Sequence, residues 1–447
     1  MFQKTDSKEL ERTITLVLCI IFLAMPVVYL LQLFGVINHE RVEYGEVVLA
    51  IGSLILLMFD IMFFFQKENR YFTVFGVLIL LYLISVCISI FTAENIGLAI
   101  SGDYITHEGG AVIVSSLIIL FSASLISDGK NRRILYFSII LVGMIQFVTG
   151  VMQAIFHSGV MITEKTEEHV LNSRAFGTIV NPNPYGSVMV LLAALEYGLL
   201  FGSKSKKGKI THAVLSIVYT YCVVLSGTRG SWVGLAVTSL VCSIIAIIIE
   251  KKQGRIKETI KKLLVVIACV VVAILASFAT SQSTISDVSA RIQADSSQGK
   301  IGEDRLIIWR NALKKYTDGN IVIGVGVSNL FIPISGGYIL EDGYESVSFD
   351  YATDAHCRYI NILCTQGLLG LVTYLVLIAY ILVTAVKRLK NGLEGKKEQF
   401  ALFVACIGFL VADAFCIRQL YMTPFFFVAL GMLLPRKESK HFLGKDN

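Results

Sequence analysis

The sequence Asp354-Ala355-His356-Cys357-Arg358-Tyr359 closes the one long polar stretch of this chain, residues 281–356. Apolar runs flank the stretch on both sides and recur from Thr13 almost to the C-terminus. A helix needs roughly 20 apolar residues to cross about 30 Å of hydrocarbon. The polar stretch is therefore predicted to be a long loop between membrane-spanning helices, with His356 at the edge of the next span.

The composition agrees with a membrane protein. The 447 residues are 55% hydrophobic and only 16% charged, which excludes a soluble multidomain protein. The apolar runs are continuous rather than alternating, so helices are favoured over barrel strands. We expect an all-α polytopic membrane protein with about 12 transmembrane helices. The predicted spans are 13–35, 45–65, 72–92, 110–127, 134–156, 183–202, 211–226, 231–249, 263–280, 357–386, 399–416 and 418–434.

The distribution of basic residues predicts the orientation. The net charge is +6, but the basic residues cluster in short loops, so no nucleic-acid partner is expected. When the connections are numbered alternately, 27 of the 39 Lys and Arg lie on one side. The positive-inside rule then places both termini in the cytoplasm and residues 281–356 outside. The other 12 basic residues face outward and can be interfacial, ion-paired or functional: Arg41, Lys165, Arg174, Arg229, Arg291, Lys300, Arg305, Arg310, Lys314, Lys315, Arg358 and Arg418.

These bounds divide the chain into four parts. We expect nine helices in residues 1–280, an extracytoplasmic loop subdomain in 281–356, three helices in 357–434 and a cytoplasmic tail in 435–447. The first apolar run is too long for a signal-peptide core, so it is interpreted as a retained span. The nine cysteines include no Cys-x-x-Cys pair. They predict neither a disulfide framework nor a metal site.

The long loop is predicted to contain a short amphipathic helix. Two acidic residues start it, and apolar residues follow at helical spacing: Leu306, Trp309, Leu313 and Tyr316. On this helix Arg305 lies one turn before Trp309, whereas Arg310 lies about 140° round and aligns with Lys314. We therefore expect Arg305 to face a site, and Arg310 with Lys314 and Lys315 to form a solvated side. Turns are then predicted at Gly324, Gly326, Gly336 and Gly337.

Two shorter connections on the same side carry further candidates. Arg174-Ala-Phe-Gly-Thr and Asn181-Pro-Asn183-Pro-Tyr-Gly precede a span, and form either a substrate contact or a rigid turn with helix caps. Ser-Gly-Thr228-Arg229-Gly-Ser-Trp joins two spans. Glycine and serine alone would suffice for such a turn. The arginine therefore points to a bidentate contact with phosphate.

His356 is the candidate general base. A neutral imidazole accepts a proton from a hydroxyl near neutral pH. A histidine at the start of a span can also be a simple interfacial residue. Its position at the end of the loop that carries Arg305, on the same side as Arg229 and Arg174, favours the catalytic interpretation.

Together these motifs resemble the O-antigen ligase and polymerase superfamily over about residues 170–385. The remaining likeness lies in Arg305-x-x-x-Trp309, Gly324-Val-Gly326, Ala355-His356 and Gly367-Leu-Leu-Gly370. The resemblance implies a GT-C-like, inverting, metal-independent membrane glycosyltransferase without a cofactor. Its donor would be an undecaprenyl-diphosphate-linked oligosaccharide and its acceptor a glycan or lipid-linked hydroxyl. The product would be a surface polysaccharide: O-antigen of lipopolysaccharide, capsule or wall glycan.

The resemblance also assigns roles. Arg229 and Arg305 would bind the donor diphosphate, Arg174 would be a weaker contact and His356 would be the base. Many relatives have asparagine where this chain has Cys357. Further possible site residues are Asn181, Asn183, Thr228, Trp309, Arg310 and Asp413.

A transporter, including a flippase of lipid-linked saccharides, is the alternative. Twelve spans with both termini inside also suit that class. Transporters, however, tend to carry ionisable groups near mid-membrane and repeated halves. Here the ionisable residues gather on one face, with Asp60 the main exception. Ligation and polymerisation both stay open.

Overall fold

The computed structural model describes most of the chain. It covers residues 7–36, 44–65, 74–103, 106–155, 174–179, 181–281, 303–341, 344–390, 392–393 and 395–434, with 286, 289 and 293. The predicted tail, 435–447, lies outside the described residues. The helices are α1 (Ser7–Leu33), α2 (Tyr44–Phe64), α3 (Val74–Phe91), α4 (Ile96–Ser101), α5 (Gly110–Leu125), α6 (Gly129–Ala154), α7 (Pro182–Gly202), α8 (Lys206–Leu225), α9 (Arg229–Lys251), α10 (Ile256–Thr280), α12 (Glu303–Asp318), α13 (Arg358–Leu389), α14 (Lys397–Asp413) and α15 (Thr423–Leu433).

The helix lengths confirm a polytopic membrane protein. Within the described ranges, nine helices are long and apolar enough to cross a membrane, namely α1, α2, α3, α6, α7, α8, α9, α10 and α13. Each predicted span overlaps one helix. However, α5, α14 and α15 have 16, 17 and 11 residues, which is short for a full crossing. The number of 12 spans and the GT-C likeness therefore stay predictions.

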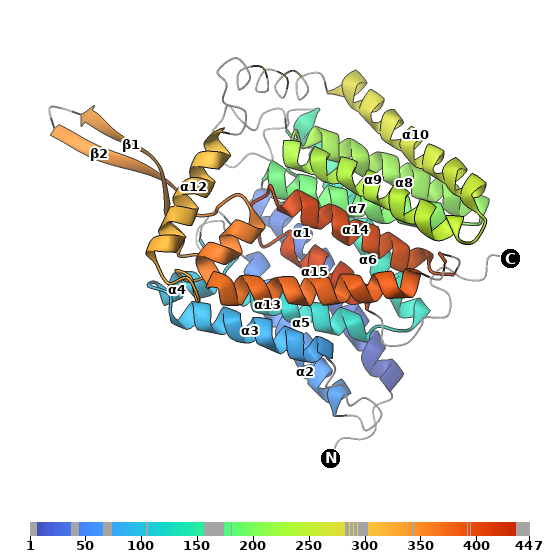
Figure 1. The fold of residues 1–447 in the computed structure, drawn as a ribbon, viewed down its shortest axis with the longest axis horizontal. Coiled ribbons are helices and arrows are strands. Elements are labelled where there is room, and N and C mark those ends of the chain that lie inside the picture. The colour runs from blue at the N-terminus through green and yellow to red at the C-terminus, as the bar shows by residue number, and fades with distance from the viewer. Residues whose placement is uncertain are drawn as a thin grey trace.

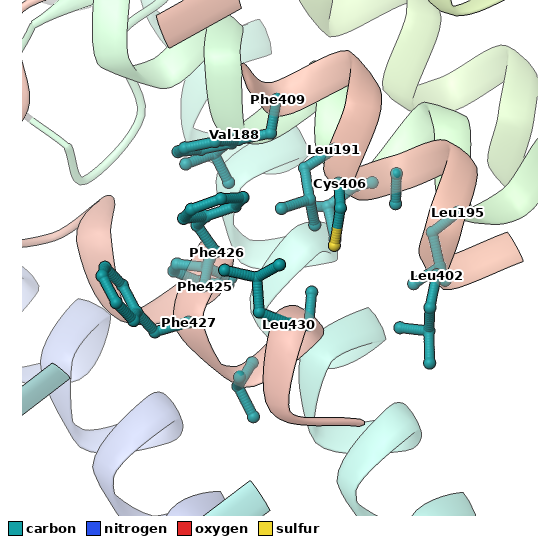
Figure 2. Close-up of a cluster of buried hydrophobic side chains, with 14 of the residues drawn as sticks. Val188, Leu191, Leu195, Leu402, Cys406, Phe409, Phe425, Phe426, Phe427 and Leu430 are labelled. Atoms are coloured by element: carbon teal, nitrogen blue, oxygen red, sulfur yellow. The ribbon is translucent and has the colours of Figure 1, made fainter. Parts of the chain in front are cut away.

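Helix α7 forms the centre of the bundle. Of its most apolar 18 residues 94% are buried, against 28% to 50% in the other membrane-length helices. It packs against α8 and α14, and Figure 2 shows side chains of α7, α14 and α15 filling the space between them. The rings of Phe409 and Phe426 stack there with centroids 4.6 Å apart. A helix that is apolar on every side belongs in such an interior.

The polar loop gathers at one end of the bundle. Helix α12 and two strands, β1 (Ile332–Glu341) and β2 (Tyr344–Ala352), lie there, and the strands project away from the helices (Figure 1). The strands pair antiparallel, with Gly336 opposite Phe349 and Gly337 opposite Ser348. The predicted turn at Gly336 and Gly337 is therefore wrong, because both lie inside β1. The all-α prediction holds for the membrane helices, while the loop adds this hairpin.

Candidate active site

The polar loop is attached to α13 where that helix is broken. Inside α13, Gly367 has a φ of 66° and leaves the helical conformation. The break exposes backbone groups to residues 321–326. Four hydrogen bonds result: from Val325 N to Cys364 O (3.0 Å), Gly326 N to Thr365 O (2.9 Å), Leu368 N to Ile321 O (2.9 Å) and Leu369 N to Val322 O (3.0 Å).

Two glycines make this close approach possible. A Cβ atom on Gly367 would lie 2.2 Å from the carbonyl oxygen of Val322, and one on Gly324 would lie 2.6 Å from that of Cys364. Both glycines also have positive φ, which other residues adopt at a cost. The glycines of the two motifs Gly324-Val-Gly326 and Gly367-Leu-Leu-Gly370 therefore include positions that fasten the loop to α13.

Helix α12 packs on the start of α13. The indole Nε1 of Trp309 donates to the carbonyl of Ala355 at 3.0 Å, and the thiol of Cys364 lies 3.4 Å from the carbonyl of Ala312. Residues at a spacing of four form the buried face: Ile308, Ala312 and Tyr316. These contacts place α12 against α13 and the residues that precede it.

The exposure of the α12 side chains shows which face packs on α13. Leu306 and Leu313 are 58% and 39% exposed, so they lie outside this packed face, and an apolar face that suits the membrane surface stays a prediction. The helix is rotated so that Ile308 and Ala312 face α13 instead. Arg310 and Lys314 are exposed, on the solvated side that helical spacing predicts.

His356 occupies a strained turn before α13. Its φ is +53°, a conformation that costs a residue with a side chain roughly 1–2 kcal/mol. Its backbone N–H donates to Oδ1 of Asp354 at 2.7 Å, and its Nδ1 lies 3.1 Å from the carbonyl oxygen of Asp354. If Nδ1 carries the proton and donates to that carbonyl, Nε2 is the acceptor.

The surroundings of His356 favour the neutral imidazole. Burial lowers its pKa below the usual value, the hydrogen bond with the Asp354 backbone raises it, and the charge of Arg305 lowers it again. The net direction is downward. The ring is therefore neutral at physiological pH and can accept a proton.

Arg305 senses the charge of Arg229. Burial lowers the pKa of Arg305, the thiol of Cys416 raises it, and the charge of Arg229 lowers it again. Arg229 is exposed and is the first residue of α9, where the helix dipole adds positive potential. Two positive charges and the N-terminus of α9 therefore act on this region, a combination that favours a bound anion.

Arg174 holds the Arg229 turn from behind. It is buried, and donates from Nε to Ser226 O at 2.8 Å and from Nη2 to Thr228 Oγ1 at 3.0 Å. The same Nη2 lies 3.2 Å from Oδ1 of Asn183. Thr228 in turn donates to the carbonyl of Pro182 at 3.0 Å. These bonds fix the turn between α8 and α9 against the start of α7.

Asn181 caps helix α7. Its Oδ1 accepts from the backbone N–H of Asn183 at 2.9 Å. Of the two interpretations that the sequence left open for this connection, these contacts describe the turn with caps. Asn181, Asn183 and Thr228 thus lie near the site and support Arg229 and Arg174.

Asp413 is bound to an arginine. Arg418 donates to its carboxylate from Nη2 at 2.6 Å and from Nε at 3.0 Å, and both side chains are fully buried. Arg418 lies in the connection between α14 and α15, since α15 begins at Thr423 rather than at residue 418. The carboxylate of Asp413 is therefore paired with Arg418 rather than with His356.

A second buried pair lies beside the histidine turn. Arg358, the first residue of α13, donates to Glu108 at 2.6 Å, and Glu108 also accepts from Thr423 at 2.8 Å. A polar pocket of about 20 Å³ adjoins the pair, and Asp103, Glu108, Asp354 and Arg358 are among its lining residues. A volume of that size holds about one water molecule.

Sequence reasoning did not select Asp354 or Glu108. Asp354 stands in the quoted motif, two residues before His356, and its place in the motif was the available signal. Glu108 lies in a polar connection on the same predicted side as His356. Its partner is 250 positions away, so no local pattern joins them.

An apolar groove of about 400 Å³ begins beside the Arg229 turn. It runs between α8, α9 and α10, which lie side by side in Figure 1. Its lining includes Trp232, less than one turn after Arg229, and then Leu235, Val266, Val270, Ile274 and Phe278. The groove offers contact to a long apolar chain.

The family comparison concerns the segment that carries Arg229, Arg305 and His356. Residues 214–375 match the family model described as O-antigen ligase, which confirms the resemblance drawn from the motifs. The matched segment begins in α8 and ends in α13. It includes Arg229, Arg305 and His356, whereas Arg174 precedes it. A search of the curated proteins found no match.

Proposed function

The chain carries an O-antigen ligase family domain over residues 214–375, and we propose that it is a membrane glycosyltransferase of surface glycan assembly. It transfers or polymerises undecaprenyl-diphosphate-linked saccharide units on the outer side of the cytoplasmic membrane, with both termini in the cytoplasm. The product is a surface polysaccharide such as O-antigen, capsule or wall glycan.

The observation that carries the proposal is the electrostatic coupling of Arg229, Arg305 and a neutral histidine. Burial is the main cause of the lowered pKa values of Arg305 and His356, and the charge of Arg229 adds to the first and that of Arg305 to the second. The bond from Trp309 to Ala355 ties α12, which carries Arg305, to the His356 turn, and together these observations support one shared site. Two adjacent cations suit a diphosphate, which carries at least two negative charges. Such preorganised donors stabilise charge that develops in a transition state.

The reaction is a single displacement at the anomeric carbon of the donor sugar. Nε2 of His356 accepts the proton of the acceptor hydroxyl while that oxygen forms a bond to the anomeric carbon. The bond from this carbon to the diphosphate oxygen breaks on the opposite face, which inverts the configuration. Arg229 and Arg305 hold the negative charge that the diphosphate gains. The proton stays on His356 until it passes to solvent.

The apolar groove supports a lipid-linked donor. It begins beside Arg229 and continues along membrane-length helices. A polyprenyl chain placed there leaves its diphosphate next to Arg229. Burial of apolar surface then holds the donor while the arginines orient its headgroup.

The test is glycosyl transfer by the purified protein. The protein, reconstituted in lipid nanodiscs, is incubated with a lipid-diphosphate oligosaccharide that also serves as acceptor. Elongated glycan and free undecaprenyl diphosphate are expected. His356→Ala and Arg229→Ala abolish most of the product at equal expression, while Lys314→Ala, an exposed change on α12, keeps it.

Two outcomes contradict the proposal. Full activity in both His356→Ala and Arg229→Ala removes the assigned site. Movement of the saccharide across vesicle membranes without any new glycosidic bond supports the flippase instead. A parallel vesicle assay with the same donor distinguishes the two functions.

A further inference from the structure

The residue that fixes His356 is a buried acid of its own turn. Asp354 is only 6% exposed, and its Oδ1 accepts the backbone N–H of His356 at 2.7 Å. This bond supports the left-handed backbone of His356, beside the 3.1 Å contact of its Nδ1 with the carbonyl oxygen of Asp354. We infer that Asp354 is a positioning residue, whose ionised carboxylate holds the His356 turn in the conformation that presents the imidazole to the acceptor hydroxyl. This inference rests on the proposed function.

The neighbouring contacts leave the turn little freedom. The carbonyl of Ala355 accepts from Trp309 at 3.0 Å, and its N–H donates to Oδ1 of Asn361 at 3.4 Å. Together with the bond from His356 to Asp354, they hold successive residues of the turn. The contact with Trp309 ties it to α12, the helix that carries Arg305. The carboxylate of Asp354 supplies the bond of this set that holds the backbone of His356.

The environment of Asp354 makes its ionisation sensitive to pH. Burial raises its pKa to about 7; the hydrogen bond from His356 and the charge of Arg358 oppose this rise, while Glu108 and Asp103 add to it. Glu108 and Asp103 come from the segment before α5, and Arg358 from α13. The thiols that also sense its charge belong to Cys357, Cys364 and Cys416. The carboxylate is thus ionised above about pH 7 and protonated below it.

The Asp354 carboxylate titrates at a higher pH than the His356 imidazole. The pKa of His356 is lowered from its model-peptide value of 6.5, so the base stays neutral in the range where Asp354 gains its proton. A charge-assisted hydrogen bond is roughly twice as strong as a neutral one. Protonation of Asp354 therefore loosens the turn before the base itself is lost, and the transfer rate falls as the pH drops through about 7.

Asp354→Asn tests the negative charge of Asp354 separately from its shape. The amide keeps the shape and an acceptor oxygen, but it does not titrate. At about pH 8 the wild type is expected to turn over several-fold faster than Asp354→Asn, and at about pH 6 the two rates converge. Asp354→Ala removes the acceptor, and its kcat is expected to fall about 100-fold with little change in the KM for donor.

A structural readout accompanies the kinetics. Diethyl pyrocarbonate modifies neutral imidazole, and mass spectrometry of the peptide gives the rate at His356 alone. The rate of labelling at His356 is expected to change several-fold in Asp354→Ala. In Asp354→Asn it should return part of the way to the wild-type value. Asp318→Asn, the same chemical change at an exposed position on α12, leaves labelling and turnover at wild-type values.

The outcomes separate this inference from the proposed function. Altered labelling of His356 in a protein that forms no glycosidic bond keeps the positioning role and removes the function. Wild-type labelling, kcat and pH profile in both Asp354 variants overturn the positioning role. If Asp354→Ala does not fold, a constant ratio between wild type and Asp354→Asn from about pH 6 to 8 overturns it as well.

Discussion

Two pairs of arginines differ in their charged neighbours. The distribution of basic residues predicts that all four lie on one side of the membrane: Arg229, Arg305, Arg358 and Arg418. Arg358 and Arg418 are buried, and each donates to a carboxylate at 2.6 Å. The pKa of Arg305 is instead lowered, by burial and also by the charge of Arg229. Arg358 and Arg418 belong to neutral ion pairs, whereas Arg305 senses the positive charge of Arg229.

The difference explains which cations suit a substrate. A buried arginine with a carboxylate has its charge already compensated inside the protein. Two neighbouring arginines at a helix N-terminus raise the local potential and attract an anion. The same residue type is therefore structural at one position and a candidate ligand at another, and the partner decides which. Mutations at the two pairs of arginines should therefore have different effects, on stability at one pair and on glycosyl transfer at the other.

The largest effect is expected at the buried pair of Arg418 and Asp413. Arg418→Met leaves the Asp413 carboxylate buried without its partner, and stability should fall by about 3 to 5 kcal/mol. Arg418 also lies 5.2 Å from the ring centroid of Phe426, so its contact with the aromatic core is disturbed too. Thermal unfolding in detergent measures the loss. The double variant Arg418→Met with Asp413→Leu should recover much of it, and failure to recover would mean that packing rather than charge dominates.

Arg305→Ala should show the reverse pattern. The rate of transfer is expected to fall about 100-fold to 1,000-fold, since a donor to the developing charge is lost. Thermal stability should stay near the wild-type value, because Arg305 is only half-buried. Steady-state kinetics and unfolding are measured on the same preparation. A drop in stability as large as that of Arg418→Met would place Arg305 with the structural arginines.

Arg305→Lys tests geometry separately from charge. Lysine keeps the positive charge but loses the planar fork that binds two phosphate oxygens at once. The expected loss is on the order of tenfold in kcat/KM, between wild type and Arg305→Ala. Lys314→Arg on the exposed side of α12 is the matched control. An Arg305→Lys variant as poor as Arg305→Ala would show that charge alone contributes little.

The sequence predicted the features of the chain that follow from hydropathy and motif order. Continuous apolar runs identified the membrane helices, and helical spacing placed Arg310 and Lys314 on the exposed side of α12. The choice of Arg305 followed from its helical spacing to Trp309, and the choice of Arg229 from a turn for which glycine and serine alone would suffice. These inferences depend on local patterns, which the chain expresses without reference to distant residues.

What was missed depends on contacts between distant segments. Glu108 is paired with a residue 250 positions later, and Leu306 is exposed because α12 turns Ile308 towards α13. Gly367 breaks an apolar helix to receive the backbone of Val322, and no periodicity marks that break. Asp354 is adjacent in sequence to the predicted base. Its role could be inferred only from the left-handed backbone of His356, which the sequence does not reveal.

The smallest predicted effect concerns the charge of Arg305 at His356. That charge contributes to the lowered pKa of His356, so Arg305→Ala should raise the His356 pKa towards its ordinary value. The direction follows because removal of a positive neighbour makes protonation less unfavourable. The midpoint of diethyl pyrocarbonate labelling at His356 should therefore move to higher pH. Lys314→Ala, which removes an exposed charge from the same helix, should leave the midpoint unchanged. An equal shift in both variants would mean that His356 senses the net charge of α12 rather than one arginine, and the contrast between paired and adjacent arginines would then not extend to the base.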